Sequence, residues 1–351
     1  LFSSRRRHTR CAIKSRGLGD VYKRQTYHGD ASYFKTKLKF VEDATAQDLK
    51  NTAAKWLTKG KHILVCNPFP DYTIEPSTVD RSKLPELGPQ KSSKFPKLQR
   101  ARLSNGLEVV LAQRAGVSTV IMNLVSDAGY KTDHLSSPGT AELTMNLLDE
   151  GTKDKTSLQI NEQLQLLGAT LSTFSDQDQS NVYMSTLKPS FDASLNLFAD
   201  VILNPEFPQE EFNRLKNEQI NDIKQEKSEP FGMALRVMNK YLYGEDHPYG
   251  SPYTGTGYEE TVSKLTRDDV AKFYNTWILP NNSTLNVTGD ISMDEWKPKL
   301  EKALGKWKKG EVPQIVFKAP KTYTKNTLYL MNRPESQQSV IIAGHLTNKY
   351  G

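Results

Sequence analysis

The stretch from Pro138 to Thr152 reads PGTAELTMNLLDEGT. Its apolar residues recur with the spacing of one face of an α-helix, and they are Ala141, Leu143, Leu147 and Leu148. A glycine stands near each end of the stretch, Gly139 and Gly151. The pattern predicts a helix over residues 140–148, and the neighbouring segments decide what it packs against.

Strand patterns precede this helix, and more helices follow it. Arg102–Asn105 leads through the turn signal Asn105-Gly106 into a second strand, Leu107–Gln113, and a third is predicted at Thr119–Ser126. Later elements are predicted as a helix at Ser157–Leu167, strands within residues 169–187, and helices at residues 190–203 and Gln209–Lys227. Helices that follow strands without regular alternation favour an α+β class over a doubly wound sheet.

A helix-turn-strand unit occurs twice. Residues 44–68 align without gaps on a segment 221 positions later, and the matched residues are Thr45 with Thr266, Asp48 with Asp269, Trp56 with Trp277 and Leu64 with Leu285. Each copy opens on a Thr suited to cap a helix, with an Asp three positions on. The similarity favours a duplicated unit, because repeated units dictate architecture.

The basic character of the chain is confined to residues 1–25. This leader holds eight Lys and Arg residues against one acidic residue, Asp20, which accounts for the whole formal net charge of +7. The leader lacks the apolar region of a secretory signal. It resembles a translated sequencing adapter joined to a gene fragment; the alternative is a disordered basic arm that grips phosphate. Since the remaining 326 residues are neutral, no nucleic-acid partner is expected.

Residues 80–97 form a predicted linker. The segment DRSKLPELGPQKSSKFPK contains three prolines and few apolar residues, and prolines disfavour both helix and sheet interiors. No stretch of the chain approaches the 18 or so apolar residues that span a bilayer. Two cysteines in 351 residues are too few for a disulfide framework.

The residues around the first helix resemble a known motif. Gly139, Ala141, Gly151 and Thr152 stand as in the frame Gly-x-Ala-H-x-x-E-H-x-x-x-x-Gly-Thr of the insulinase/pitrilysin family, zinc peptidases with an inverted H-x-x-E-H motif. Further similar segments follow in family order, Asn204–Phe207 and His247–Gly250 among them. The resemblance covers residues 26–351.

The residues that the family uses for chemistry are replaced. Glu142 and Asn146 stand at the two histidine positions, Met145 at the general-base glutamate, and Asp222 at the distant acidic ligand. Two imidazoles four residues apart share one helix face and can bind one Zn²⁺, with a carboxylate as third ligand. Two carboxylates and an amide at most hold a hard cation weakly. We therefore expect no catalytic, cofactor-binding or metal-binding residue in this chain.

The resemblance also implies an architecture. Longer family members have two similar halves, each of two α+β domains with a mixed or antiparallel sheet and packed helices, closing around a peptide. On that model residues 26–79 are the tail of the second domain, 98–245 the third domain and 246–351 a truncated fourth domain. The chain is then expected to be a fragment whose catalytic, zinc-binding N-terminal half is missing.

Two functional hypotheses follow from the resemblance. The first is the inactive half of a zinc metalloendopeptidase, which helps to enclose and position peptide or unfolded protein substrates together with the missing half. The second is a non-catalytic scaffold subunit related to processing peptidases. An intact H-x-x-E-H upstream distinguishes them. Compartment is unknown from the residues, and family habit favours a periplasmic or exported bacterial protein.

Overall fold

The computed structural model describes residues 33–58, 60, 96–320, 325–334, 336 and 338–347. The chain forms two units, Leu1–Gln90 and Lys91–Gly351. The leader at residues 1–25 and all of the linker at residues 80–97 except its last two residues lie outside the described residues. Both assignments stay predictions.

The first unit contains two described helices, α2 (Tyr33–Asp43) and α3 (Ala46–Trp56). Thr45 caps α3 in a capping box, because its hydroxyl accepts from the Asp48 amide while the Asp48 carboxylate accepts from the Thr45 amide. No residue of α3 is buried. The helical half of the predicted repeat is therefore present here, and its strand lies outside the described residues.

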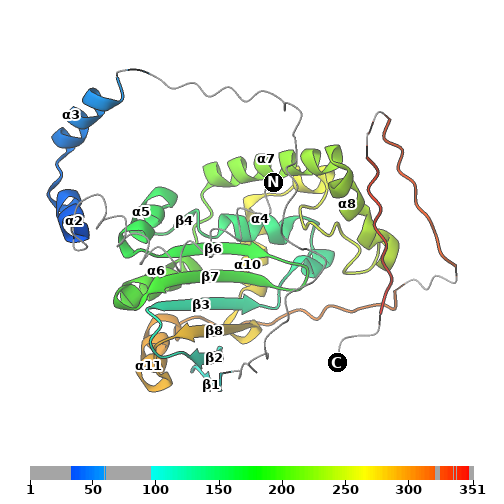
Figure 1. Ribbon diagram of the computed structural model, residues 1–351. Coiled ribbons are helices and arrows are strands. Elements are labelled where there is room, and N and C mark those ends of the chain that lie inside the picture. The colour runs from blue at the N-terminus through cyan, green and yellow to red at the C-terminus, as the bar shows by residue number, and fades with distance from the viewer. Residues whose placement is uncertain are drawn as a thin grey trace, which may run out of the picture. The chain divides into compact units, whose positions relative to one another are not determined.

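The second unit is built on a six-stranded sheet in the order β1-β2-β8-β3-β7-β6 (Figure 1). All neighbours pair antiparallel except β2 and β8, which run parallel. The strands are β1 (Leu98–Arg102), β2 (Glu108–Gln113), β3 (Thr119–Ser126), β6 (Thr170–Ser175), β7 (Ser180–Leu187) and β8 (Ser283–Gly289). A small hairpin joins β4 (Gly151–Thr152) to β5 (Lys155–Thr156).

Helices cover this sheet and one another. α4 contacts β6, β7, α7 and α10, α6 contacts β7, and α11 contacts α6. Their bounds are α4 (Thr140–Leu147), α5 (Ser157–Leu167), α6 (Phe191–Leu203), α7 (Gln209–Ser228), α8 (Pro230–Tyr243), α9 (Glu259–Val262), α10 (Arg267–Trp277) and α11 (Met293–Leu304), with 3-10 turns η1 (Tyr130–Leu135), η2 (Lys188–Ser190) and η3 (Pro280–Asn282). The expected α+β class is confirmed.

One apolar core joins the sheet to the helices. Every second residue of β3 is buried, as alternation on a pleated strand requires. Leu124 of β3, Phe198 of α6 and Trp296 of α11 are at most 1% exposed. The core therefore draws on residues from Leu103 to Trp307.

The sheet extends across the expected domain boundary at residues 245 and 246. β8 lies in register between β2 and β3, so that Leu285 pairs with both Val109 and Leu124. The Asn105 side chain also donates to the carbonyl of Leu304 at 2.8 Å. Residues 98–245 and 246–307 thus share one sheet and one core, because the strand that closes the ladder comes late in the chain.

The apolar run Ser339–Gly344 forms no strand in the described part of the chain. Ile341 is 88% exposed. A strand needs a partner for its backbone groups, and among the described strands none pairs with this run.

Candidate functional site

The N-terminus of α4 is held by a buried carboxylate and a glycine. Asp133 of η1 accepts hydrogen bonds from the amides of Gly139 and Ala141 at 2.8 and 2.9 Å. Gly139 has a φ of +98°, and a Cβ there would lie 2.7 Å from Val262 and 2.8 Å from the Gln219 side chain. Only glycine allows this conformation and this approach.

At the other end of the frame, Gly151 and Thr152 also make packing and hydrogen-bond contacts. A Cβ on Gly151 would lie 2.8 Å from the ring of Pro208. The Thr152 hydroxyl donates to Asp200 at 3.1 Å, and its backbone pairs with Pro205. The frame residues Gly139, Ala141, Gly151 and Thr152 therefore position α4 whether or not a metal is held.

The four altered motif positions separate into two groups. Glu142 and Asn146 lie one turn apart on α4, and the Asn146 amide donates to the Glu142 carboxylate at 3.3 Å. Asp222 of α7 lines the same pocket as these two residues. Met145 is fully buried in the apolar core. A packing residue therefore stands at the position of the general base.

We call the hollow between these helices the α4–α7 pocket. Its volume is about 270 Å³, and it is lined by Glu142, Asn146, Leu215, Glu218, Gln219, Asp222 and Thr256. The motif alignment missed Gln219 and Thr256. A glutamine on a long polar helix looks like a surface residue, and Gln219 is only 4% exposed.

Gln219 connects α4, α7 and the loop after α8. Its side-chain nitrogen donates to the carbonyls of Gly139 and Thr256 at 3.0 and 2.9 Å. Both partners are acceptors, which fixes the orientation of the amide. Its Oε1 is buried and accepts no hydrogen bond from the described residues.

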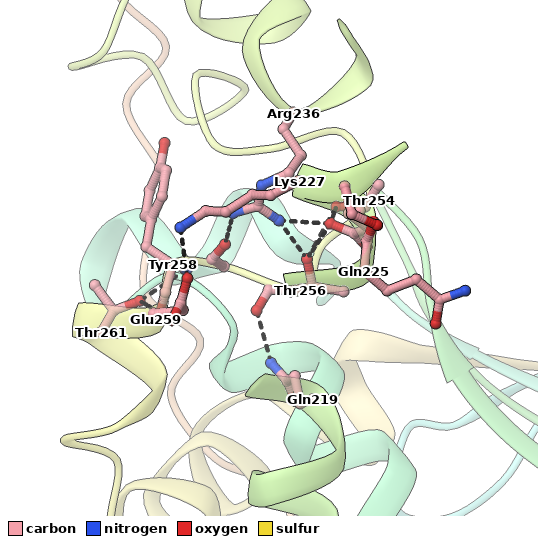
Figure 2. A network of polar contacts seen from close by, with 12 residues as sticks. Gln219, Gln225, Lys227, Arg236, Thr254, Thr256, Tyr258, Glu259 and Thr261 are labelled. Carbon is pink, nitrogen blue, oxygen red and sulfur yellow. Dashed lines mark hydrogen bonds and ion pairs between the residues drawn. The ribbon is translucent and has the colours of Figure 1, made fainter. Parts of the chain in front are cut away.

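A buried arginine secures the Thr256 side of the pocket. Arg236 of α8 contacts the Glu226 carboxylate at 2.5 Å and the Thr256 hydroxyl at 2.9 Å. Figure 2 shows Thr256 between Arg236 and Gln219, and Lys227 paired with Glu259 nearby. Burying a charge is costly unless it is paired and hydrogen-bonded, and the Glu226 carboxylate also accepts from Thr254 and Thr256. The network fixes the loop against α7.

Three carboxyl groups, those of Glu142, Glu218 and Asp222, line the pocket. Burial, and then the carboxylates of Asp222 and Glu226, raise the pKa of Glu142 to about 7, against the lowering effect of the bond from Asn146. The pKa of Asp222 is raised by burial and by the carboxylates of Glu218 and Glu226. Desolvation and like charges both disfavour the ionised form of a carboxyl group.

These residues do not match a zinc site. Zinc in a catalytic site is held by three protein ligands, commonly with histidine among them, and the pocket offers carboxylates and amides. Across the described ranges no group of three or more His, Cys, Asp and Glu side chains is arranged to hold a metal ion.

A larger hollow of about 620 Å³ lies between α6 and α11. The charged groups that line it are largely paired with one another, Lys155 with Asp200 at 2.8 Å and Lys299 with Asp192 at 2.7 Å. Because each of these groups already has an opposite charge, the α4–α7 pocket is the better candidate for a site.

Comparison with family models gives two matches. Residues 108–248 match the model described as Insulinase (Peptidase family M16), and residues 264–351 match the Peptidase M16 inactive domain. Together the two ranges include every strand of the sheet except β1, every described helix of the second unit except α9, and all residues of the α4–α7 pocket except Thr256.

Individual relatives are distant. An uncharacterized zinc protease of Rickettsia felis is 23% identical over 244 residues, 70% of this chain and 57% of its own length. A probable mitochondrial-processing peptidase β subunit of Arabidopsis thaliana is 22% identical over 71% of this chain and 47% of its own length. This chain thus spans about half the length of the curated relatives it matches.

A solved structure shares the fold. The peptidase M16 inactive domain from Pseudomonas fluorescens superposes with a TM-score of 0.60 at 23% identity, covering 64% of this chain and 54% of that one. Among the described residues, no helix has the length and apolar character needed to cross a membrane.

Proposed function

The chain belongs to the insulinase family of peptidases, family M16, and from this premise we propose that it is a non-catalytic half that helps to enclose and position a peptide for a zinc-bearing catalytic half. The zinc, when bound in that other half, would supply the water activation that the residues of this chain do not support. An exported location stays a prediction.

One observation carries the proposal. The frame residues around α4 persist in packing roles while the residues at the ligand positions are replaced and the base position is buried as Met145. A helix that keeps its packing residues but offers neither the zinc ligands nor the general base fits a non-catalytic half that helps to enclose a peptide. The match of residues 264–351 to the inactive-domain model supports the same function.

Peptide cleavage by the full-length protein tests this proposal. We expect an H-x-x-E-H motif upstream of this chain. Replacement of the glutamate of that motif by glutamine should abolish cleavage of an internally quenched peptide. The substitution Glu142→Gln in this chain should leave the rate constant of bond cleavage within about twofold, since it lies outside the chemistry.

Two results would contradict the proposal. One is cleavage by this chain alone with loss of activity in Glu142→Gln. The other is the absence of an intact upstream motif, which would favour the scaffold subunit, the alternative that the distant similarity to processing-peptidase subunits supports.

A further inference from the structure

The segment that follows α11 crosses the second unit without regular structure (Figure 1). It is fixed at Gly310 by the Asn281 side chain, which donates to the Gly310 carbonyl at 2.9 Å and accepts from the Gly310 amide at 3.1 Å. Beyond that point, no backbone-to-backbone hydrogen bond with a described residue reaches residues 311–320. We call residues 311–320 the strap, because side-chain contacts attach it to the unit.

Three side chains of the strap make these contacts. Val312 and Ile315 are partly buried against the apolar core. Phe317 is 48% exposed, and its ring lies 5.9 Å from that of His247 and 5.3 Å from that of Tyr249 between centroids. The far end of the strap is therefore attached through Phe317 to two aromatic rings.

His247 lies at the centre of an aromatic cluster formed by Tyr243, His247, Tyr249 and Phe317. Its ring stacks on that of Tyr243 of α8 at 5.0 Å and lies 5.5 Å from that of Tyr249. Tyr243 and Tyr249 meet edge to face at 5.4 Å. Ring pairs at these distances are favourable, and His247 is only 8% exposed.

The backbone fixes the protonation state of His247. Its Nδ1 accepts a hydrogen bond from the Tyr249 amide at 3.0 Å. A ring nitrogen that accepts carries no proton, so the ring is neutral and its proton is on Nε2. A second proton on Nδ1 would place two donors 3.0 Å apart, and the ring would have to turn away. Cation–π attraction to Tyr243 favours a charged ring, but it does not restore the lost bond.

The surroundings of His247 disfavour its charged form. Burial lowers the pKa of His247, the Lys318 backbone in the strap acts against this, and His134 of η1 adds to the lowering. The ring therefore binds a proton more readily after it has left the cluster. By linkage, the closed arrangement loses stability as pH falls below the ordinary histidine value of 6.5.

The acidic groups nearest to the cluster already have partners. Asp178, in the turn between β6 and β7, accepts from the Tyr249 hydroxyl at 2.6 Å and contacts the Lys131 ammonium at 3.5 Å. Glu245, which follows α8, pairs with Lys240. Neither carboxylate is therefore a free counter-ion for a protonated His247.

We propose that His247 is an acid-sensitive latch: its neutral ring holds the strap closed, and its protonation releases the strap at Phe317. Release exposes the faces of Tyr249 and Phe317 that now cover each other, so an apolar surface is presented under acidic conditions. The inference is independent of the proposed function, since it uses no residue of the α4–α7 pocket.

Spin-label mobility on the full chain tests the latch. In a Cys11→Ser/Cys66→Ser background, a nitroxide is attached at Gln314→Cys, an exposed position of the strap. Electron paramagnetic resonance spectra are recorded from pH 8 to pH 5. The ratio of mobile to ordered label should rise about fivefold or more, with a midpoint below about 6.5. An unchanged ratio would overturn the proposal.

Two variants locate the switch. His247→Asn keeps an acceptor for the Tyr249 amide and cannot be protonated, so its ratio should be independent of pH, whatever its level. Phe317→Ala should make the label at pH 8 as mobile as it is in the parent chain at pH 5. The proposal fails if His247→Asn keeps the pH dependence of the parent chain, or if Phe317→Ala leaves the strap as ordered as before.

Two controls separate the latch from other effects of acid. His134→Asn should keep the transition, because His134 only makes the proton on His247 harder to bind; loss of the transition would assign the switch to His134 and overturn the proposal. A label at Glu162→Cys, an exposed position of α5, should give the same spectrum at pH 8 and pH 5. Equal changes at both labels would show general loosening and would also contradict the latch.

Discussion

Among single residues, Gly139 shows why a motif can outlast its chemistry. Its φ of +98° is unfavourable for other residues, and a Cβ would press on Val262, Gln219 and the Thr256 carbonyl at 2.7–2.9 Å. Its conformation sets the start of α4, and its contacts join α4 to α7. The residue is needed for the fold even where the neighbouring side chains bind no metal.

Gly139→Ala should lower the free energy of unfolding by about 3 kcal/mol or more, since strain and a steric clash add. Gly116→Ala is the matched control, because Gly116 also has a positive φ, +77°, but nothing lies within 4 Å of its Cβ position. It should cost only about 1 kcal/mol. Urea unfolding measures both, and equal losses would contradict the close packing of α4 on α7.

Glu142 should give stability an unusual dependence on pH. Its folded-state pKa of about 7 lies above the ordinary value of 4.5, so the folded protein keeps a proton that the unfolded chain has lost. Its contribution therefore falls as pH rises from about 4.5 to 7 and is constant above that range. After burial, the carboxylates of Asp222 and Glu226 contribute to this raised pKa of Glu142.

Glu142→Gln should remove that contribution. The variant should match the parent chain near pH 4 and be more stable at pH 8, by about 1 kcal/mol or more. Thermal unfolding of both proteins across this range measures the difference. A variant that is less stable than the parent chain at pH 8 would show that the carboxylate is already compensated.

Among helices and strands, local signals were sufficient for most elements. Thr119–Ser126 is a strand with the predicted bounds, and Ser157–Leu167 is a helix that ends at Gly168 as expected. Alternation and caps act within a few residues, so they can be read locally. Thr156 caps that helix, because its hydroxyl accepts from the Gln159 amide.

Other features depend on distant partners and could not be predicted. The position of β8 between β2 and β3 is set by the ladder and not by its own residues. The run Ser339–Gly344 has a strand-like composition but no strand forms. Gln219 was missed because its burial comes from Gly139 and Thr256, which lie 80 and 37 residues away.

The capping box of α10 offers a test of one repeated element. Thr266 and Asp269 bond reciprocally at the start of α10, whose Val270, Phe273 and Trp277 are buried. Thr266→Ala should therefore lower the stability of the second unit by about 1 kcal/mol. Thr45→Ala, at the equivalent cap of α3, should leave that unfolding transition unchanged, because α3 belongs to the first unit. A shift of equal size in Thr45→Ala would contradict the division into two units.

Across the full fold, the late strand β8 makes the second unit indivisible at residue 245. A chain of residues 96–245 lacks β8, which lies between β2 and β3 in the sheet. The backbone edges of β2 and β3 that pair with β8 would then be exposed. A chain of residues 96–310 keeps all six strands and α11. The shorter chain should show no cooperative thermal unfolding, and the longer one should. Cooperative unfolding of residues 96–245 would restore the boundary that the sheet contradicts.

Zinc content decides whether α4 carries a former metal site. The parent chain and the variant Glu142→His/Asn146→His are dialysed against a weak chelator and assayed by mass spectrometry. The parent chain should hold no zinc, and the variant should hold about one ion per chain, because two imidazoles one helical turn apart join the carboxylate of Asp222. Stoichiometric zinc on the parent chain that is lost in Glu142→Gln or Asp222→Asn would contradict the account.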